Sequence, residues 1–284
     1  MKIFKNKKIL SVFHDAGGAN IGLSFLKQYK IKSKFFCIGP SSKILKDFFP
    51  RVKNSNNLMR EIEKSDLVIT GTSSKNKIEF IVRNFCKKKK IFSVTFLDHW
   101  ANYKNRFRKK RKEVLPDLLI TSDQKSYLEA KKLFRKTLIK KFTNYYVENL
   151  IKKIKKKKRG DKILYFLEPF NDKIEFFALN LFFQKLQKLE LFNKSIILKL
   201  HPSEKKNKYS RFIKKFKNFK IYLDDKSSMQ NLVASAKYVF GLESNALFIS
   251  LRAGKKVFTI LPLNNKKFRL PFKKIKNINK FNKF

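Results

Sequence analysis

Short apolar runs rich in β-branched and aromatic residues alternate with amphipathic segments along most of this chain. Runs of about four to eight apolar residues are typical of buried strands, and apolar residues three or four positions apart are typical of helices. The first half predicts strands at 8–13, 34–38, 66–74, 91–97 and 118–121, and helices at 21–29, 43–49, 77–85 and 123–133. The second half predicts strands at 162–167, 218–223, 237–240 and 257–261, another from 195 that ends at His201–Pro202, and helices at 173–189, 229–234 and 246–252.

This alternation of strand, loop and helix predicts an α/β fold with parallel, doubly wound sheets. A lysine-rich segment, 150–161, separates the halves and indicates a basic interdomain linker or the exposed end of a helix. We therefore expect two Rossmann-like domains that face a cleft, 1–149 and 162–284. The basic tail after Asn264 would either form a helix packed on the first domain or fray.

Several loops carry signals for turns and helix starts. The segment 14–20 is rich in small residues, and its Gly17 and Gly18 would let the chain turn sharply and a ligand approach the backbone. Serine and aspartate side chains predict helix caps at Ser41, at Ser122–Asp123 and at Ser227–Ser228.

All three histidines, His14, His99 and His201, follow predicted strands. Ligands of open α/β sheets bind at the carboxyl ends of the strands, so these histidines are expected at a ligand-binding edge. His201 would hydrogen-bond a phosphate or protonate a leaving phosphate oxygen, because imidazole titrates near neutral pH. Lys199, on the same strand face, would add positive charge or point at solvent. A surface histidine without a role is the alternative for any one of the three.

The turn Gly241–Asn245 lies between a predicted strand and a predicted helix. A helix that starts at Ser244 or Asn245 presents free backbone N–H groups and a positive dipole end, which suit a phosphate. Glu243 would accept hydrogen bonds from a ribose. The alternative is an ordinary helix cap.

A second dense group of polar and aromatic residues follows the strand at 91–97. Tryptophan and tyrosine suit the apolar face of a sugar, and arginine suits an acidic group on it. The alternative is a corner where Trp100 packs in the core. The residues of this group are Asp98, His99, Trp100, Asn102, Tyr103 and Arg106. His14 and Asp15 are candidate general bases from another loop.

The net charge of +48 indicates a polyanionic partner or a composition biased toward lysine, asparagine, isoleucine and phenylalanine. Most phenylalanines lie in apolar periods, which favours a core role over base stacking. We expect no secretory leader and no membrane span, and Cys37 and Cys86 show no metal spacing. These features favour a reducing cytoplasm, and the charge would allow peripheral contact with the inner face of an anionic membrane.

Some catalytic classes are disfavoured. The sequence has no Gly-x-Ser-x-Gly elbow, no P-loop, and no two histidines at metal-ligand spacing. We therefore expect neither a serine hydrolase nor a metal enzyme.

The second half resembles the C-terminal half of GT-B-fold glycosyltransferases over about residues 162–262. The resemblance rests on the strand ending at His201–Pro202 and on Gly241-Leu-Glu-Ser-Asn-Ala-Leu, followed by a helix and Gly254-Lys-Lys-Val-Phe. It is closest to bacterial sialyltransferase, polysialyltransferase and glycerophosphotransferase-like capsule enzymes. UDP-N-acetylglucosamine 2-epimerases share the architecture and a similar His-Pro turn.

This resemblance implies that His201 and Ser244 contact the donor phosphate. The sialyltransferases carry an acidic base in an Asp/Glu-Asp-Gly motif, and His14-Asp15-Ala16-Gly17 is similar to it with one inserted alanine. Asp98 is the rival base.

We therefore expect a metal-independent glycosyltransferase of surface-polysaccharide synthesis, with a nucleotide sugar as co-substrate, no other cofactor and no specific nucleic acid partner. Catalysis is assigned to His201 with Asp15 or Asp98. The expected donor site comprises Lys199, His201, Pro202, Gly241, Glu243, Ser244 and Asn245. A glycan or lipid-linked acceptor would contact His14, Gly17, Gly18, His99, Trp100, Asn102, Tyr103 and Arg106. The alternatives are a sugar-nucleotide epimerase that uses Asp98, Asp15 and Glu168, and a basic nucleic-acid-binding protein.

Overall fold

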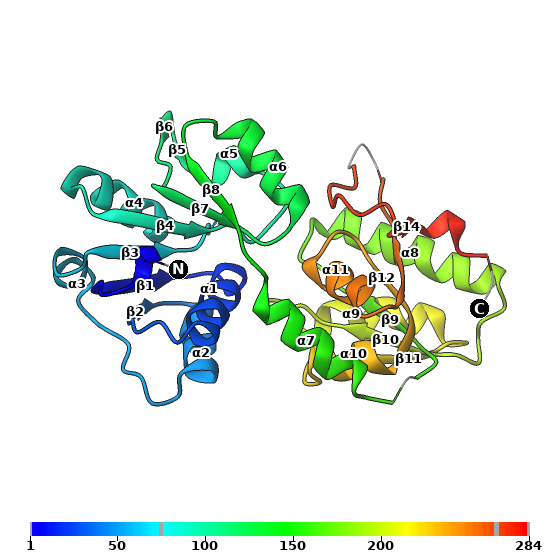
Figure 1. Ribbon diagram of the computed structural model, residues 1–284. Coiled ribbons are helices and arrows are strands. Elements are labelled where there is room, and N and C mark those ends of the chain that lie inside the picture. Colours follow the sequence, from blue (N-terminus) through cyan, green and yellow to red (C-terminus); the bar gives the residue numbers. More distant parts are fainter. Residues whose placement is uncertain (1, 74–75, 159, 264–266, 283–284) are drawn as a thin grey trace. The chain divides into compact units, whose positions relative to one another are not determined.

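The computed structural model describes residues 2–73, 76–158, 160–263 and 267–282. Positions 74, 159, 264–266 and 283–284, where the expected third strand, linker and tail fall in part, lie outside the described residues. The chain divides into two compact units, Met1–Glu148 and Asn149–Phe284 (Figure 1).

The first unit is built on a sheet of six parallel strands in the order β2-β1-β3-β4-β7-β8. The strands are β1 Ile9–Phe13, β2 Lys34–Cys37, β3 Leu67–Thr70, β4 Phe92–Phe96, β7 Leu118–Thr121 and β8 Leu138–Lys141. The helices are α1 Ala16–Gln28, α2 Pro40–Phe48, α3 Leu58–Glu63, α4 Ile78–Lys89, α5 Tyr103–Arg106 and α6 Gln124–Leu133, and α7 Tyr145–Lys155 crosses the boundary between the two units. A short hairpin, β5 Arg108–Lys109 and β6 Lys112–Glu113, follows α5, and a 3-10 turn spans Lys2–Phe4.

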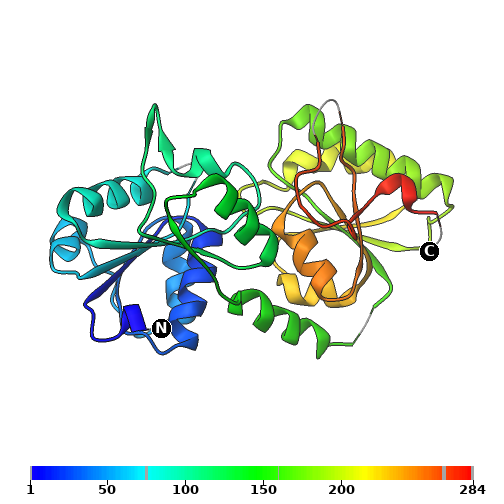
Figure 2. The ribbon, with the colours of Figure 1, turned by 45° about the horizontal axis from the view of Figure 1, so that its top comes forward.

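Helices cover both faces of this sheet, because its central strands are apolar on both sides (Figures 1 and 2). Ile9 and Phe13 of β1 pack with residues of α1, whereas Leu10 and Val12 pack with residues of α4. The alternation of side chains along a strand produces these two cores.

The second unit has a sheet of six parallel strands in the order β11-β10-β9-β12-β13-β14. The strands are β9 Lys162–Phe166, β10 Ser195–Lys199, β11 Lys220–Asp224, β12 Ala236–Gly241, β13 Lys256–Thr259 and β14 Lys276–Asn277. The helices are α8 Asp172–Lys188, α9 Asn207–Ile213, α10 Met229–Ser235 and α11 Asn245–Arg252, with 3-10 turns at Lys214–Phe216 and Ile278–Lys280.

The tail belongs to this second core. The ring of Phe281 lies 5.0 Å from those of Tyr238 and Phe258 and 5.2 Å from that of Phe240, and β14 pairs with β13. The expectation of a helix on the first domain or a frayed end is therefore wrong for residues 276–282. The buried rings of both cores confirm that most phenylalanines have a packing role.

All of the predicted strands are confirmed to within a few residues. Four further strands, β8, β14 and the two strands of the hairpin, were not predicted. Strand β8 is missed because its sequence Leu-Ile-Lys-Lys buries only Ile139. The lysine-rich segment 150–161 was expected as a linker, but residues 150–155 belong to helix α7, the alternative considered for it.

Two local expectations are wrong. The segment 14–20 is not a loop, because α1 begins at Ala16 and includes Gly17 and Gly18. Ser41 caps no helix, because α2 begins at Pro40, and its buried hydroxyl donates instead to the carbonyl oxygens of Phe13 and Ile38. By contrast, Asp123 caps α6 as predicted, through its hydrogen bonds to the amides of Lys125 and Ser126.

Candidate functional site

Each sheet reverses its strand order next to its first strand: between β1 and β3 in the first unit, and between β9 and β12 in the second. Ligands of open α/β sheets bind beside such a reversal, at the carboxyl ends of the strands. His14 follows β1, His99 follows β4 and His201 follows β10, so all three histidines lie at the carboxyl ends, as predicted.

In the second unit, a buried carboxylate joins the two loops at the reversal. Glu168, just after β9, accepts hydrogen bonds from the backbone amides of Leu242 at 2.9 Å, Glu243 at 3.0 Å and Ser244 at 3.0 Å. Burial raises the pKa of Glu168 to about 7, although these three amides oppose the shift. Gly241 packs closely against this carboxylate, because a Cβ at this position would lie 3.2 Å from Glu168 Oε1.

This arrangement changes the expected phosphate site. Helix α11 begins at Asn245 with Ser244 as its cap residue, as predicted. However, the amides of Leu242, Glu243 and Ser244 already bind the Glu168 carboxylate. A phosphate at this helix start would therefore have to use other donors.

Glu243 has a structural partner in place of the expected ribose. Arg269 donates to both of its carboxylate oxygens, through Nε at 3.1 Å to Oε2 and through Nη2 to Oε1. The side chain of Glu243 is also 5% exposed, which leaves little of it accessible to a ligand.

Some buried polar atoms at the same edge have no hydrogen-bond partner among the described residues. They include the Ser228 hydroxyl, at the start of α10, and Oδ1 of Asn245, at the start of α11. A buried polar atom without a partner costs about 1–3 kcal/mol, so each such atom requires an explanation. Ser228 is the predicted cap residue of α10, yet its side chain makes no cap hydrogen bond.

His201 lies on an exposed turn between these two helix starts in strand order. Its Nδ1 accepts a 3.2 Å hydrogen bond from the backbone amide of Ser203 and lies 2.7 Å from the Ser203 hydroxyl. This fixes the ring orientation, while Pro202 shapes the exposed turn. Lys199 does not point freely at solvent, because its ammonium group pairs with Asp224 at 3.0 Å.

A buried polar cluster lies next to the turn that carries His201. Lys208 pairs with Glu204 at 2.8 Å and Glu175 at 2.6 Å, and the Tyr209 hydroxyl donates to both carboxylates. Burial raises the pKa of Glu175 to about 7. Because Glu204 lies three residues after His201, the cluster anchors the turn that carries the histidine.

The first unit also has a buried glutamate that joins two loops where its strand order reverses. Glu79, on α4, accepts hydrogen bonds from the backbone amides of His14, at 3.2 Å, and Ser73, and it is 1% exposed. Burial raises its pKa to about 7. Gly18 of α1 and Gly71, just after β3, let these two segments approach closely, because a Cβ on Gly18 would lie 2.9 Å from the Cα of Gly71.

Asp98 is held in an ion pair rather than left available. Its Oδ1 accepts hydrogen bonds from Arg106 Nη1 at 2.9 Å and from the Thr72 hydroxyl at 2.7 Å. Arg106 also donates to the carbonyl oxygens of Thr72 and Ala101. Gly17 packs against Asp98, since a Cβ there would overlap the carboxylate at 2.1 Å.

His14 and Asp15 form a close pair. His14 Nδ1 lies 2.5 Å from Asp15 Oδ1, and the two side chains are 20% and 33% exposed. Asp15 precedes α1 but gives no side-chain cap hydrogen bond, because its carboxylate faces His14.

The remaining predicted acceptor residues divide into two groups. Trp100 is partly exposed, donates from Nε1 to Asp123 at 2.7 Å, and its ring centroid lies 5.9 Å from that of His99. Tyr103 instead belongs to a hydrophobic core and is 6% exposed, so it is not placed to stack on a sugar. Asn102 is exposed in the left-handed backbone region and precedes α5.

Sequence analysis missed Glu79 and Arg83. Arg83 is buried and donates to the carbonyl oxygens of Gly71 and Arg106, which joins two of the loops described above. Both residues lie on the apolar face of α4 beside Phe80 and Cys86, and a charge at such a position was the available signal.

In the described part of the chain, no three histidine, cysteine or acidic side chains group as metal ligands. Within the same residues, no helix is long and apolar enough to cross a membrane.

Comparisons with solved structures identify the fold of this chain. A UDP-GlcNAc 2-epimerase from Methanocaldococcus jannaschii, solved with UDP-GlcNAc and UDP, matches 96% of this chain and 90% of its own, with a TM-score of 0.66 and 12% identity. This is a GT-B-type fold. MnaA from S. aureus, solved with UDP, matches 90% of this chain and 79% of its own, with a TM-score of 0.64 and 13% identity. The UDP-N-acetylglucosamine 2-epimerase of Rickettsia bellii matches 83% and 74%, with a TM-score of 0.53 and 16% identity.

Sequence comparison adds little to this. No family model matches the chain. A stretch of 188 residues, 61% of this chain, is 29% identical to the periplasmic chaperone PpiD of Buchnera aphidicola. The chain spans 28% of the length of that chaperone. The predicted two-domain α/β fold of GT-B type is therefore confirmed by structural likeness.

Proposed function

We propose that this protein is a sugar-nucleotide enzyme whose second domain binds the nucleotide. The observation that carries the proposal is the pair of unpartnered buried atoms, Ser228 Oγ and Asn245 Oδ1, at the carboxyl edge of the second sheet. His201 follows β10 at the same edge, beside β11, which precedes Ser228. A nucleotide offers the hydroxyl, phosphate and base groups that such donors and acceptors bind. UDP is bound in the solved structures of two proteins with this fold, which supports the proposal.

We further propose that the reaction is glycosyl transfer to a glycan or lipid-linked acceptor in surface-polysaccharide synthesis. The contact between His14 and Asp15 supports this choice, because a carboxylate that orients an imidazole makes an effective general base. In the proposed step, the acceptor hydroxyl gives its proton to His14 as its oxygen bonds to the anomeric carbon of the sugar. The bond from that carbon to the phosphate oxygen breaks, and the nucleotide leaves with the new negative charge on its phosphate.

The geometry favours the His14–Asp15 pair over Asp98 as the base. The Arg106 guanidinium lies 2.9 Å from Asp98, and both side chains are 12% exposed. The Asp98 carboxylate already accepts hydrogen bonds from Arg106 and Thr72, so it is less available to a substrate hydroxyl. In this proposal Asp98 has a positioning role, and Trp100 is the aromatic residue that remains accessible to an acceptor sugar.

An epimerase is the second candidate, because the three structural neighbours described above include two named UDP-GlcNAc 2-epimerases. A nucleic-acid-binding protein has no such support, and the aromatic side chains pack mainly in the two cores.

Product analysis separates the two enzymes. Purified protein is incubated with UDP-GlcNAc and other nucleotide sugars, with and without a glycan acceptor mixture, and the products are resolved by chromatography and mass spectrometry. A transferase releases free nucleotide and extends an acceptor, and Asp15→Asn greatly slows both. Conversion of the nucleotide sugar to its epimer without acceptor would replace the transferase proposal with the epimerase.

A further inference from the structure

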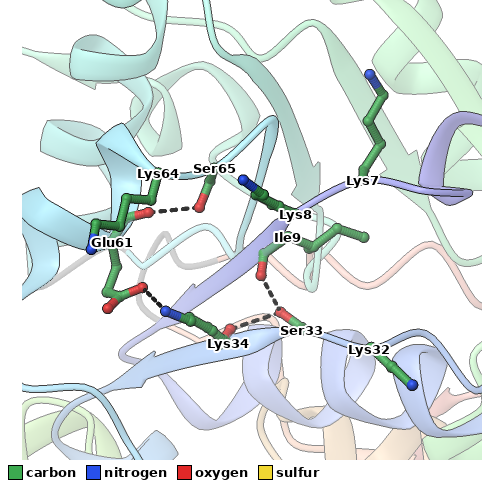
Figure 3. Close-up of a pocket in the computed structure, with 9 residues that line it drawn as sticks. All are labelled: Lys7, Lys8, Ile9, Lys32, Ser33, Lys34, Glu61, Lys64 and Ser65. Carbon is green, nitrogen blue, oxygen red and sulfur yellow. Dashed lines mark hydrogen bonds and ion pairs between the residues drawn. The ribbon is translucent and has the colours of Figure 1, made fainter.

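A basic pocket lies at the amino-terminal edge of the first sheet, the edge opposite His14. It has a volume of about 670 Å³ and is bordered by the start of β1, the start of β2 and the segment between α3 and β3 (Figure 3). Its lining residues are Lys7, Lys8, Ile9, Lys32, Ser33, Lys34, Glu61, Lys64 and Ser65. Because the strands separate this pocket from the carboxyl edge of the same sheet, it does not depend on the function proposed above.

The charges of the pocket are unbalanced. Five of its lining residues are lysines, and Glu61 is the one acidic residue among them. Lys34 pairs with Glu61 at 2.8 Å, and its hydrogen bond lowers the pKa of that carboxyl. Asp66 lies nearby and accepts a 2.8 Å hydrogen bond from the backbone amide of Lys8. Among the described residues, no side-chain carboxylate pairs with the other four lysines that line the pocket.

Short hydrogen bonds hold the walls of this pocket. The Ser33 hydroxyl donates to the carbonyl oxygens of Lys34, at 2.7 Å, and Ile9, at 3.2 Å. The Ser65 hydroxyl donates to the carbonyl oxygen of Glu61 at 2.6 Å. Figure 3 shows these bonds along the inner wall, with Lys34 directed at Glu61 and Lys7 and Lys32 extended away from it. These hydrogen bonds therefore fix the backbone that carries the lysines.

The lining chemistry fits phosphate. Lysine acts as a compact point charge toward phosphate oxygens, and the volume lies in the usual range of small-molecule sites. The lining includes no aromatic side chain, whereas single-stranded nucleic acids are usually bound by stacking on such rings.

We propose that this pocket binds the phosphate groups of a small polyanion, which is either a phospholipid headgroup or a soluble diphosphate. In this proposal Lys8, Lys32 and Lys64 turn toward the ligand from three different segments, and Lys34 joins them by exchanging Glu61 for the ligand.

The test must distinguish binding at this pocket from binding that depends only on the net positive charge of the protein. One variant carries Lys8→Gln, Lys32→Gln and Lys64→Gln. A matched control carries Lys87→Gln, Lys88→Gln and Lys89→Gln at the exposed end of α4, which removes the same charge elsewhere. A third variant replaces Lys8, Lys32 and Lys64 by arginine, which keeps the charge and checks that the site tolerates substitution.

Binding is measured by sedimentation with vesicles of equal parts phosphatidylcholine and phosphatidylglycerol, and by calorimetry with inorganic pyrophosphate, both at physiological salt. We expect the pocket variant to bind the vesicles, or pyrophosphate, or both, more weakly than the control variant does. The difference should be at least about tenfold. Loss confined to vesicles identifies a lipid headgroup, and loss confined to pyrophosphate identifies a soluble ligand.

Several outcomes would overturn the proposal. Equal weakening in the pocket and control variants would show that only the overall charge acts, and unchanged binding in both would show that the pocket is not used. Failure of the arginine variant to retain binding would also contradict it. A single-stranded RNA probe is tested as well. If only the pocket variant binds RNA more weakly, and vesicles and pyrophosphate bind it as before, the ligand would be a nucleic acid and not a small polyanion. None of these results affects the nucleotide site, which is tested separately.

Discussion

The carboxylate of Glu168 accepts a 3.0 Å hydrogen bond from the backbone amide of Ser244, across the strand reversal of the second sheet. Glu79 bridges the equivalent reversal in the first sheet, where it accepts hydrogen bonds from the amides of His14 and Ser73. In both domains a buried glutamate therefore holds together the two loops at the edge where α/β sheets bind ligands.

Removing the Glu168 carboxylate should disrupt the loop it holds. Glu168→Ala leaves the buried amides of Leu242, Glu243 and Ser244 without their acceptor, and each such loss costs about 1–3 kcal/mol. We expect a loss of at least about 3 kcal/mol in the free energy of unfolding, measured by urea denaturation. Asp161→Ala is the control, since that side chain is 75% exposed, and it should change stability little. Equal stability of the two variants would contradict the role of Glu168.

Stability should fall as the pH rises from about 4.5 to about 7. Burial raises the pKa of Glu79, Glu168 and Glu175 from 4.5 to about 7 in the folded protein. Between these values the unfolded chain binds fewer protons than the folded chain, so the free energy of unfolding decreases by up to about 1.4 kcal/mol per pH unit for each group.

Chemical denaturation across this pH window checks the sign of the effect. Glu168→Gln should reduce the slope, because it removes one of the three titrating groups. A stability that rises with pH through the window, or a slope that is the same in wild type and Glu168→Gln, would contradict this account.

Much of this arrangement could be predicted from sequence, and the reason is local. Short apolar runs followed by His14, Asp98 or His201 indicate buried strands that end in polar loops. Asp123 as a helix cap also depends only on neighbouring residues. These features follow from patterns within one element and its cap.

The features that were missed depend on residues far apart in the chain. The hydrogen bond from Leu242 to Glu168 joins positions 74 residues apart, and neither neighbourhood indicates it. Gly17 was interpreted as part of a ligand loop, whereas Asp98 explains it by requiring a residue without a side chain at its carboxylate. The tail was misjudged because its charge hides Ile278 and Phe281, which are buried in the second core.

Ser228→Ala distinguishes a ligand-binding hydroxyl from a structural one. The Ser228 hydroxyl is buried and makes no hydrogen bond with the described residues, so its removal should leave the unliganded protein as stable or slightly more stable. The variant should nevertheless lose nucleotide binding by about tenfold, the equivalent of about 1.4 kcal/mol. Thermal unfolding with and without nucleotide measures both effects. A variant that is destabilised but binds nucleotide normally would show that the hydroxyl is structural.

The His14–Asp15 pair should act on the reaction and not on donor binding. Asp15→Asn keeps the size of the side chain but removes the charge that orients His14, so kcat should fall by about a hundredfold or more. The dissociation constant for the nucleotide should remain within about twofold, because an absent base does not alter the donor site. Asp47→Asn, at an exposed position of α2, is the control. A loss of nucleotide affinity without a change in kcat would contradict the assignment.

The most direct test of the central claim is nucleotide binding by the second domain at His201. Thermal shifts are measured with CMP, CDP, UDP, GDP and dTDP on the wild type and His201→Ala, in about 0.3 M salt so that screening suppresses nonspecific polyanion binding. The account predicts that one nucleotide, at about 100 times its dissociation constant, adds about 2.7 kcal/mol of stability to the wild type and little to the variant. No selective stabilisation by any nucleotide, or equal stabilisation of wild type and His201→Ala, would contradict it.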